Sequence, residues 1–245
     1  MIKYSIQTHL SCFISPLDRY FDASKYKKKI HFKTQQNFSI ASLGDQNKAM
    51  QIKMFEQSDV ALRSTIEQFI QEKYQHIHHA SIEHFSSILF AGYSQTGLQV
   101  AIGMEKLTQK KAFLEQYLDI PIEQALNKIS RSTITRDKIA EIGNLAAKNI
   151  EQAKLMVAFL VFYLSKQQIK WAVCTGITAV RYVLQQMGLR FYVLEKANPD
   201  ALGIKKHLWG SYYQQKPYVL AICVEEALQV AQKQYQFFDT APVFE

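Results

Sequence analysis

The segment Ile139–Ala147 constrains the fold more than any other stretch, because it places one carboxylate, Glu141, inside an otherwise apolar strand pattern. A long apolar run follows it, and then a second short strand pattern at Lys170–Thr175. The run between them predicts a buried helix over Glu151–Lys166. A strand, a buried helix and a further strand form a β–α–β unit, so we expect a mixed α/β fold.

The remaining hydrophobic patterns complete a mixed central sheet flanked by helices. Further strands are predicted at Lys48–Phe55, His84–Tyr93, Leu98–Lys106, Arg190–Glu195 and Pro217–Val224, and further helices at Val60–Tyr74, from Pro121, at Ala179–Met187 and from Glu225. Residues 1–45 are irregular in pattern. We therefore divide the chain into an N-terminal extension (1–45), one α/β domain (46–236) and a C-terminal tail (237–245).

Glu141 is the main candidate for a catalytic residue. In a regular strand its side chain shares one face with Ile139, Gly143 and Leu145, because successive residues point to opposite faces. Apolar neighbours keep water away from the carboxylate and raise its pKa towards the range of a general base. The ordinary alternative is a glutamate that pairs with a lysine or arginine across the sheet.

Charge and cysteine content argue against several other functions. The net charge is +8, and its basic cluster Lys25–Lys29 suits either an anionic partner or a solvated loop, but no nucleic-acid-binding motif accompanies it. The N-terminus has no signal-peptide pattern and the longest apolar run is about half of a membrane crossing, so we expect a cytoplasmic protein without a membrane span. The cysteines form no metal-binding pattern. A histidine cluster also lacks a zinc-binding spacing, so we expect no metal site; it consists of His76, His78, His79 and His84.

Two acidic residues and three aromatic residues are further candidates for substrate binding. Glu115 and Asp119 are four residues apart, so on one helical face they would hold the ammonium group of a substrate. They fit ordinary packing equally well. Trp209, Tyr212 and Tyr213 suit either core and lid packing or the lining of an acyl-chain site.

Four blocks of sequence carry a resemblance to a known family, and they extend over roughly Val60 to Leu228. They are residues 113–119 with 121–123, residues 141–146, residues 171–175 with Arg181 and Gly188-Leu189, and residues 209–213 before Pro217. Together they resemble the thermostable hemolysin family and, beyond it, acyltransferases with the GNAT fold. More distantly, the EIGNLA stretch looks like the glutamate-containing strand of acyl-homoserine-lactone synthases, and the layout resembles N-acyl amino acid synthases.

The resemblance implies a GNAT-like fold and transfer of an acyl chain from a pantetheine thioester to a small amine such as an amino acid. In the resembled enzymes the matching glutamate is the proposed general base, which points to Glu141. The resemblance also implies that the pantetheine arm lies between the central strands, at Asn144, Leu145, Ala146, Ala147, Lys148 and Thr175. It implies no permanently bound cofactor, because acyl carrier protein or acyl-CoA enters as co-substrate.

The chain departs from the resembled enzymes in two places. Asn144 stands where the lactone synthases usually carry arginine, so we expect a different amine substrate. The helix start, AAKNIEQ, lacks the glycines of a pyrophosphate-binding loop, which favours an acyl carrier protein over free coenzyme A as donor. Two alternatives stay open at this point: a membrane-active hemolysin-like protein without catalysis, and a non-catalytic module that binds a carrier protein.

Overall fold

The structure of the protein is a computed structural model that describes residues 36–240 apart from 44, 46–48, 109–110 and 131. The basic cluster Lys25–Lys29 and residues 1–35 of the predicted extension lie outside the described residues. Within the described parts of the chain, no helix is both long enough and apolar enough to cross a bilayer.

Nine strands in the described ranges form one sheet, in the order β7-β8-β6-β5-β4-β3-β2-β1-β9. Their bounds are β1 Asn37–Ser42, β2 Met50–Glu56, β3 Ile88–Ser94, β4 Gly97–Lys106, β5 Ile139–Ala147, β6 Trp171–Gly176, β7 Tyr192–Lys196, β8 Tyr218–Cys223 and β9 Tyr235–Thr240. All neighbouring pairs among them are antiparallel except β5 and β6, which are parallel. Parallel neighbours need a long crossover connection, and α4 (Ile150–Lys166) provides it.

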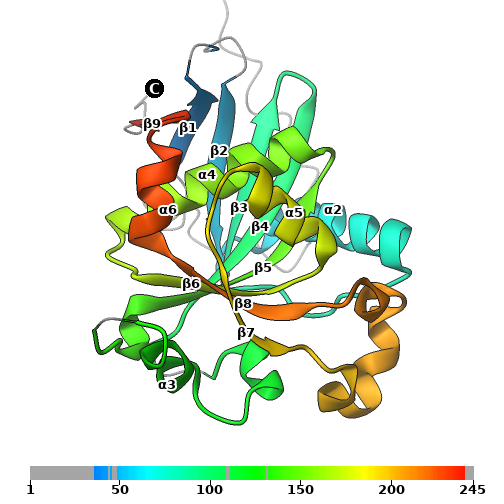
Figure 1. The fold of residues 1–245 in the computed structure, drawn as a ribbon. Coiled ribbons are helices and arrows are strands. Elements are labelled where there is room, and N and C mark those ends of the chain that lie inside the picture. Colours follow the sequence, from blue (N-terminus) through cyan, green and yellow to red (C-terminus); the bar gives the residue numbers. More distant parts are fainter. Residues whose placement is uncertain (1–35, 44, 46–48, 109–110, 131, 241–245) are drawn as a thin grey trace, which may run out of the picture. The chain divides into compact units, whose positions relative to one another are not determined.

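Helices cover both faces of the sheet (Figure 1). On one face α4 packs with α5 (Thr178–Gln186) and α6 (Val224–Ala231) over the largest hydrophobic core. On the other face α2 (Val60–His78) covers β2 to β5. Short helices cover the remaining part of that face, near β6 to β8. They are α3 (Ile122–Asn127) and the 3₁₀ helices Phe113–Tyr117, Arg136–Lys138, Pro199–Trp209 and Tyr212–Gln215.

The apolar run after β5 forms the buried helix that the sequence predicts. Phe159 of α4 is fully buried and contacts Phe90 of β3 edge to face, with ring centroids 5.1 Å apart. Asn149 begins the helix, and its side chain accepts a hydrogen bond from the Gln152 N–H at 3.0 Å. A side-chain cap of this kind stabilises a helix by about 1 kcal/mol. Sequence and structure therefore agree on the β5–α4–β6 unit that carries Glu141.

Two strands lie where no regular structure was expected. β1 lies within residues 1–45, and the register of β9 pairs it with β1 along Asn37–Ser42. The expectation of an irregular N-terminal stretch is therefore wrong for these residues. The division of the chain into an extension, a domain and a tail stays a prediction.

The first strand of the predicted hairpin begins later than expected. The pattern from His84 predicts a strand, but β3 begins at Ile88. Polar contacts hold residues 84–87 in an irregular conformation instead.

Candidate active site

β5 and β6 are paired along only part of their length. Their register runs from Ile139↔Trp171 to Ile142↔Cys174, and within the described residues it does not continue beyond that point. β6 goes on pairing with β8 on its other side, as far as Gly176. The end of β5 therefore has one edge with no strand beside it, at the level of the predicted pantetheine site.

A β-bulge in β5 lies beside this opening. Against β4 the register passes from Gly103↔Gly143 to Ala101↔Ala146, so two residues of β5 face one residue of β4. Asn144, one of the two, has a φ of 51°. A bulge of this kind bends a strand and redirects its side chains.

The bulge changes which residues share a face of β5. Leu145 packs with Ala140 in the core beneath α4, whereas Ile139 belongs to the core on the opposite face. The expectation that Leu145 shares the face of Glu141 is therefore wrong. Strict alternation fails here because the extra residue shifts the following side chains by one position.

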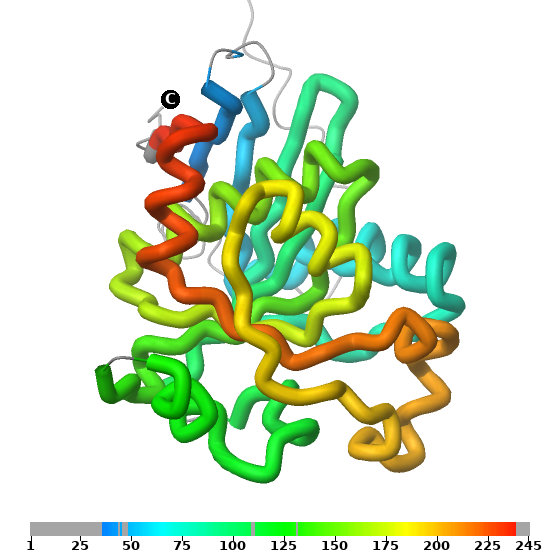
Figure 2. Tube along the Cα trace, viewed as in Figure 1, coloured from blue at the N-terminus to red at the C-terminus, as the bar shows by residue number. Residues whose placement is uncertain are grey.

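A large cavity occupies the region of the opening, with a volume of about 840 Å³. This is within the range of small-molecule binding sites. One group of lining residues comes from β5, β6 and the helices that cover them, and it includes Glu141, Leu145, Val157, Leu160, Thr175 and Val183. Another group comes from α2 and the aromatic segment after β7, and it includes Tyr74, His78, Trp209, Tyr212 and Tyr213. Figure 2 shows this segment, in orange, beside the C-terminal end of α2, in cyan, where the Ser211 N–H donates to the His78 carbonyl.

Glu141 lines the cavity and is half-buried. Its carboxylate accepts hydrogen bonds from the Phe113 N–H at 2.7 Å and from the Leu114 N–H at 2.8 Å. Burial raises the pKa of Glu141 to about 7, and these two hydrogen bonds only partly oppose the effect. Within the described residues, no lysine, arginine or histidine forms an ion pair with this carboxylate. Near neutral pH the group is thus divided between the two protonation states that a general base needs.

Five of the six predicted donor-site residues line the cavity, namely Asn144, Leu145, Ala146, Ala147 and Thr175, and Lys148 does not. The side chain of Asn144 is bonded to Ser86 and His84, which line the cavity with it. Ala146 is buried against α2, and Ala147 packs in the core beneath α4. Lys148 is exposed, and its N–H donates to the Gln99 carbonyl at 2.9 Å.

Asn149 caps the start of α4, where its side chain accepts the Gln152 N–H at 3.0 Å. Residues 146–152, before and at this helix start, carry no glycine, so they do not form a glycine-rich pyrophosphate loop.

Thr175 lies in β6 just beyond the last residue paired with β5. Its hydroxyl oxygen is buried and has no hydrogen-bond partner among the described residues. Its carbonyl accepts a hydrogen bond from the Tyr212 hydroxyl at 3.1 Å. The neighbouring Cys174 also lines the cavity. Burial raises the pKa of the Cys174 thiol to about 12, which makes it a poor nucleophile at neutral pH.

Glu115 and Asp119 lie elsewhere. Neither is among the residues that line the cavity. The 3₁₀ helix ends at Tyr117, so the two residues do not share one helical face. The buried carboxylate of Glu115 binds the Arg136 guanidinium through both oxygens, at 2.5 and 2.9 Å, and also accepts the N–H groups of Ala112 and Ile122. Amine binding by these two residues stays a prediction, and the geometry gives Glu115 a structural role.

Replacing Glu115 by Gln is expected to destabilise the fold by about 3–5 kcal/mol, since it breaks a buried ion pair and leaves Arg136 with less compensation. Burial opposes ionisation of Glu115, but the hydrogen bonds from Arg136, Ile122 and Ala112 outweigh it and lower the pKa. Its stabilising effect is therefore present above the unfolded pKa and is lost as the pH falls through the folded value.

Urea unfolding at neutral pH measures this difference. Glu123→Gln is the matched control, because Glu123 binds the same guanidinium but its side chain is 29% exposed against 4% for Glu115. Equal losses for the two variants would contradict the structural role of Glu115.

Sequence reasoning missed His78 as a cavity residue. Only 7% of His78 is exposed, and its ring packs against Tyr74 and Tyr212. Burial lowers the pKa of its imidazole. The predicted helix ends at Tyr74, four residues before His78, whereas α2 continues to His78, and the other ring partner, Tyr212, is distant in sequence.

The sequence pattern of the thermostable hemolysin family matches residues 56–228. The chain belongs to this family. The matched residues run along the chain from the end of β2 into α6, and they include the two strands, β5 and β6, that flank the opening. No curated protein matches the chain.

Several solved structures are similar to this thermostable hemolysin family member. The acyl-homoserine-lactone (AHL) synthase LasI has a TM-score of 0.53 at 9% identity, with 74% of this chain and 93% of that chain covered. FeeM, an N-acyl amino acid synthase from uncultured soil microbes, has a TM-score of 0.49 at 13% identity, covering 81% and 99%. The CoA-dependent AHL synthase BjaI has a TM-score of 0.49 at 10% identity, covering 74% and 86%. The nine-stranded sheet with helices on both faces and the likeness to LasI confirm the predicted GNAT-like α/β fold.

Proposed function

We propose that this protein is an acyltransferase that moves an acyl chain from a pantetheine thioester to an amine such as an amino acid. The observation that carries the proposal is the position of Glu141. Its carboxylate lines a large cavity where β5 and β6 separate, and it ionises near neutral pH. The LasI fold supports the assignment, because LasI is a synthase of acyl-homoserine lactones.

In the proposed reaction the amine nitrogen attacks the thioester carbonyl carbon. A C–N bond forms and the C–S bond breaks, while Glu141 accepts the proton that the amine loses. Glu141 passes this proton, directly or through a water, to the leaving sulfur, which departs as the free thiol, and the carboxylate is regenerated. Backbone N–H groups near Leu145, on the edge of β5 without a strand partner, stabilise the negative charge on the carbonyl oxygen.

The pantetheine arm is proposed to lie in the opening between β5 and β6. There its amide groups run along residues 144–147 and meet the unpartnered hydroxyl of Thr175. A buried polar atom without a partner is costly, so a ligand that supplies one gains affinity. The absence of a glycine-rich pyrophosphate loop at the start of α4 favours a donor with few phosphates. We therefore propose acyl carrier protein as the donor in preference to acyl-CoA.

The apolar residues between β5, α4 and α5 are proposed to hold the acyl chain. Val157, Leu160 and Val183 line this part of the cavity, and each buried methylene contributes about 0.8 kcal/mol. The amine acceptor then approaches from the side of His78 and Trp209, where hydrogen-bonding groups and aromatic rings line the cavity together.

Acyl transfer tests this proposal with purified protein, one acyl chain presented either on carrier protein or on coenzyme A, and a mixture of amino acids. Mass spectrometry is expected to detect an N-acylated amine, formed faster from the carrier-protein donor. Leakage of lipid vesicles without any acyl donor, together with no acylated product, would instead favour a membrane-active protein. Carrier-protein binding without product would favour a non-catalytic module.

The rate is expected to rise with pH through about 7. Glu141 acts as a base only when ionised, and its pKa is raised from 4.5 to about 7. Below this value kcat/KM falls about tenfold per pH unit, and above it the profile levels off. Initial rates measured from pH 5 to pH 9 test this pH dependence. A rate that does not change between pH 5 and 8 would contradict the role of Glu141.

A further inference from the structure

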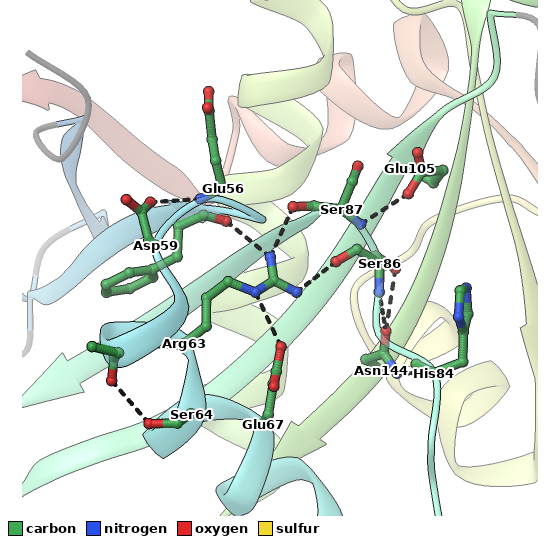
Figure 3. Close-up of polar contacts among 12 residues, drawn as sticks. Glu56, Asp59, Arg63, Ser64, Glu67, His84, Ser86, Ser87, Glu105 and Asn144 are labelled. Carbon is green, nitrogen blue, oxygen red and sulfur yellow. Dashed lines mark hydrogen bonds and ion pairs between the residues drawn. The ribbon is translucent and has the colours of Figure 1, made fainter. Parts of the chain in front are cut away.

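A buried arginine of α2 binds the irregular segment 84–87 from one side (Figure 3). Arg63 is 4% exposed. Its guanidinium donates to the Ser87 carbonyl at 2.8 Å and to the Ser86 carbonyl at 2.9 Å. Glu67, one turn further along the helix, accepts its Nε–H at 3.0 Å. Two consecutive backbone carbonyls of this irregular segment thus accept hydrogen bonds from one side chain.

The β5 bulge binds the same segment from the other side. The Asn144 side-chain oxygen accepts the N–H of Ser86 at 3.1 Å and its hydroxyl at 3.2 Å. The Asn144 side-chain amide donates to the His84 carbonyl at 3.1 Å. Segment 84–87 therefore connects the guanidinium of Arg63 to the side chain of the bulge residue, as Figure 3 shows.

The side-chain hydrogen bonds of Asn144 help to hold its backbone in the left-handed region. Asparagine adopts this region more readily than most other residues with a side chain, and an uncommon conformation persists where neighbouring groups hold it. At Gly103, on the facing strand, an added Cβ would lie 2.6 Å from the Ser86 hydroxyl and 2.7 Å from the Asn144 side-chain oxygen. The hydrogen bonds between Ser86 and Asn144 therefore fit only because β4 has a glycine at position 103.

We propose that Arg63 is a positioning residue, which holds the β5 bulge in its left-handed conformation through segment 84–87. The inference rests on the proposed function, in which backbone N–H groups near Leu145, beside the bulge, stabilise the charge on the thioester carbonyl oxygen. Arg63 itself is not among the residues that line the cavity. Its effect on turnover is indirect and passes through Asn144.

A double-mutant cycle tests this dependence. Arg63→Gln is expected to lower kcat about tenfold or more, since small displacements of catalytic groups are costly, while the KM for the acyl donor stays within twofold. Arg63→Lys restores part of the loss. Asn144→Gly adopts a φ of 51° without side-chain support, so in that background Arg63→Gln is expected to change kcat by less than about twofold. Additive losses would overturn the proposal.

Hydrogen exchange supplies a readout that does not depend on activity. Arg63→Gln is expected to speed amide exchange over residues 143–147 more than in β1 or β9. Arg190→Gln, at an exposed site in the loop between α5 and β7, is expected to leave exchange at the bulge unchanged. If Arg63→Gln does not fold, Gly103→Ala perturbs the same network and is expected to give the same local change. Unchanged exchange at the bulge would overturn the proposal. If the wild-type protein transfers no acyl group, the proposed function fails, and exchange still decides whether Arg63 holds the bulge.

Discussion

Glu141→Gln is expected to reduce kcat by about a hundredfold or more, because the amide cannot accept the proton that the amine loses. The substitution keeps the size of the side chain, but only one of its two terminal atoms still accepts a backbone N–H. The hydrogen bonds from Phe113 and Leu114 are therefore weakened, and a modest loss of stability accompanies the loss of rate. Steady-state rates with saturating acyl donor and amine measure the effect.

Two controls separate lost chemistry from lost structure in this experiment. Glu83→Gln makes the same change at an exposed carboxylate beside the same cavity, and its rate is expected to stay within twofold of the wild type. Thermal unfolding of both variants shows how much folded protein each assay contains. A Glu141→Gln enzyme that is folded and as fast as Glu83→Gln would remove Glu141 from the role of base.

Val157→Phe is expected to shift the preference towards short acyl chains. Val157 lies on α4, lines the cavity and is half-buried, so a larger side chain there fills space that a long acyl chain would occupy. One extra or missing methylene in an apolar pocket changes kcat/KM by about 10- to 200-fold. We expect a loss of this size with a long-chain donor and less than a threefold change with a short-chain donor.

The matched control for this prediction adds the same ring away from the cavity. Val193 on β7 is 54% exposed and is not among the lining residues, so Val193→Phe is expected to leave the chain-length profile unchanged. The profile is measured as kcat/KM for a series of donors that differ only in chain length. Equal losses for short and long chains in Val157→Phe would mean that the acyl chain binds elsewhere.

The parts of the fold that follow from local pattern were predictable. The apolar run after β5 predicts α4, because a helix that is hydrophobic on nearly all sides must be buried. The carboxylate within β5 identifies Glu141 for the same reason, since a charged group among apolar residues needs special surroundings. Both inferences use residues that are close together in the sequence.

The parts that depend on distant contacts were not predictable in this way. The hydrogen-bond donors to Glu141 come from Phe113 and Leu114, more than 25 residues before it. The buried pairing of Glu115 with Arg136 is likewise invisible to a helical-spacing argument. Only the bulge left a local trace, because asparagine tolerates the left-handed conformation better than most residues, and Asn144 interrupts an apolar strand.

One measurement tests both the acyl-transfer reaction and the role of Glu141 as its base. It is mass spectrometry of lipid extracts from cells that express the wild-type protein or Glu141→Gln at matched levels of folded protein. An N-acylated amine that accumulates with the wild type and is nearly absent with the variant is the predicted result. The account would be contradicted by equal amounts of that product in both extracts, or by a wild-type extract indistinguishable from that of cells carrying an empty vector.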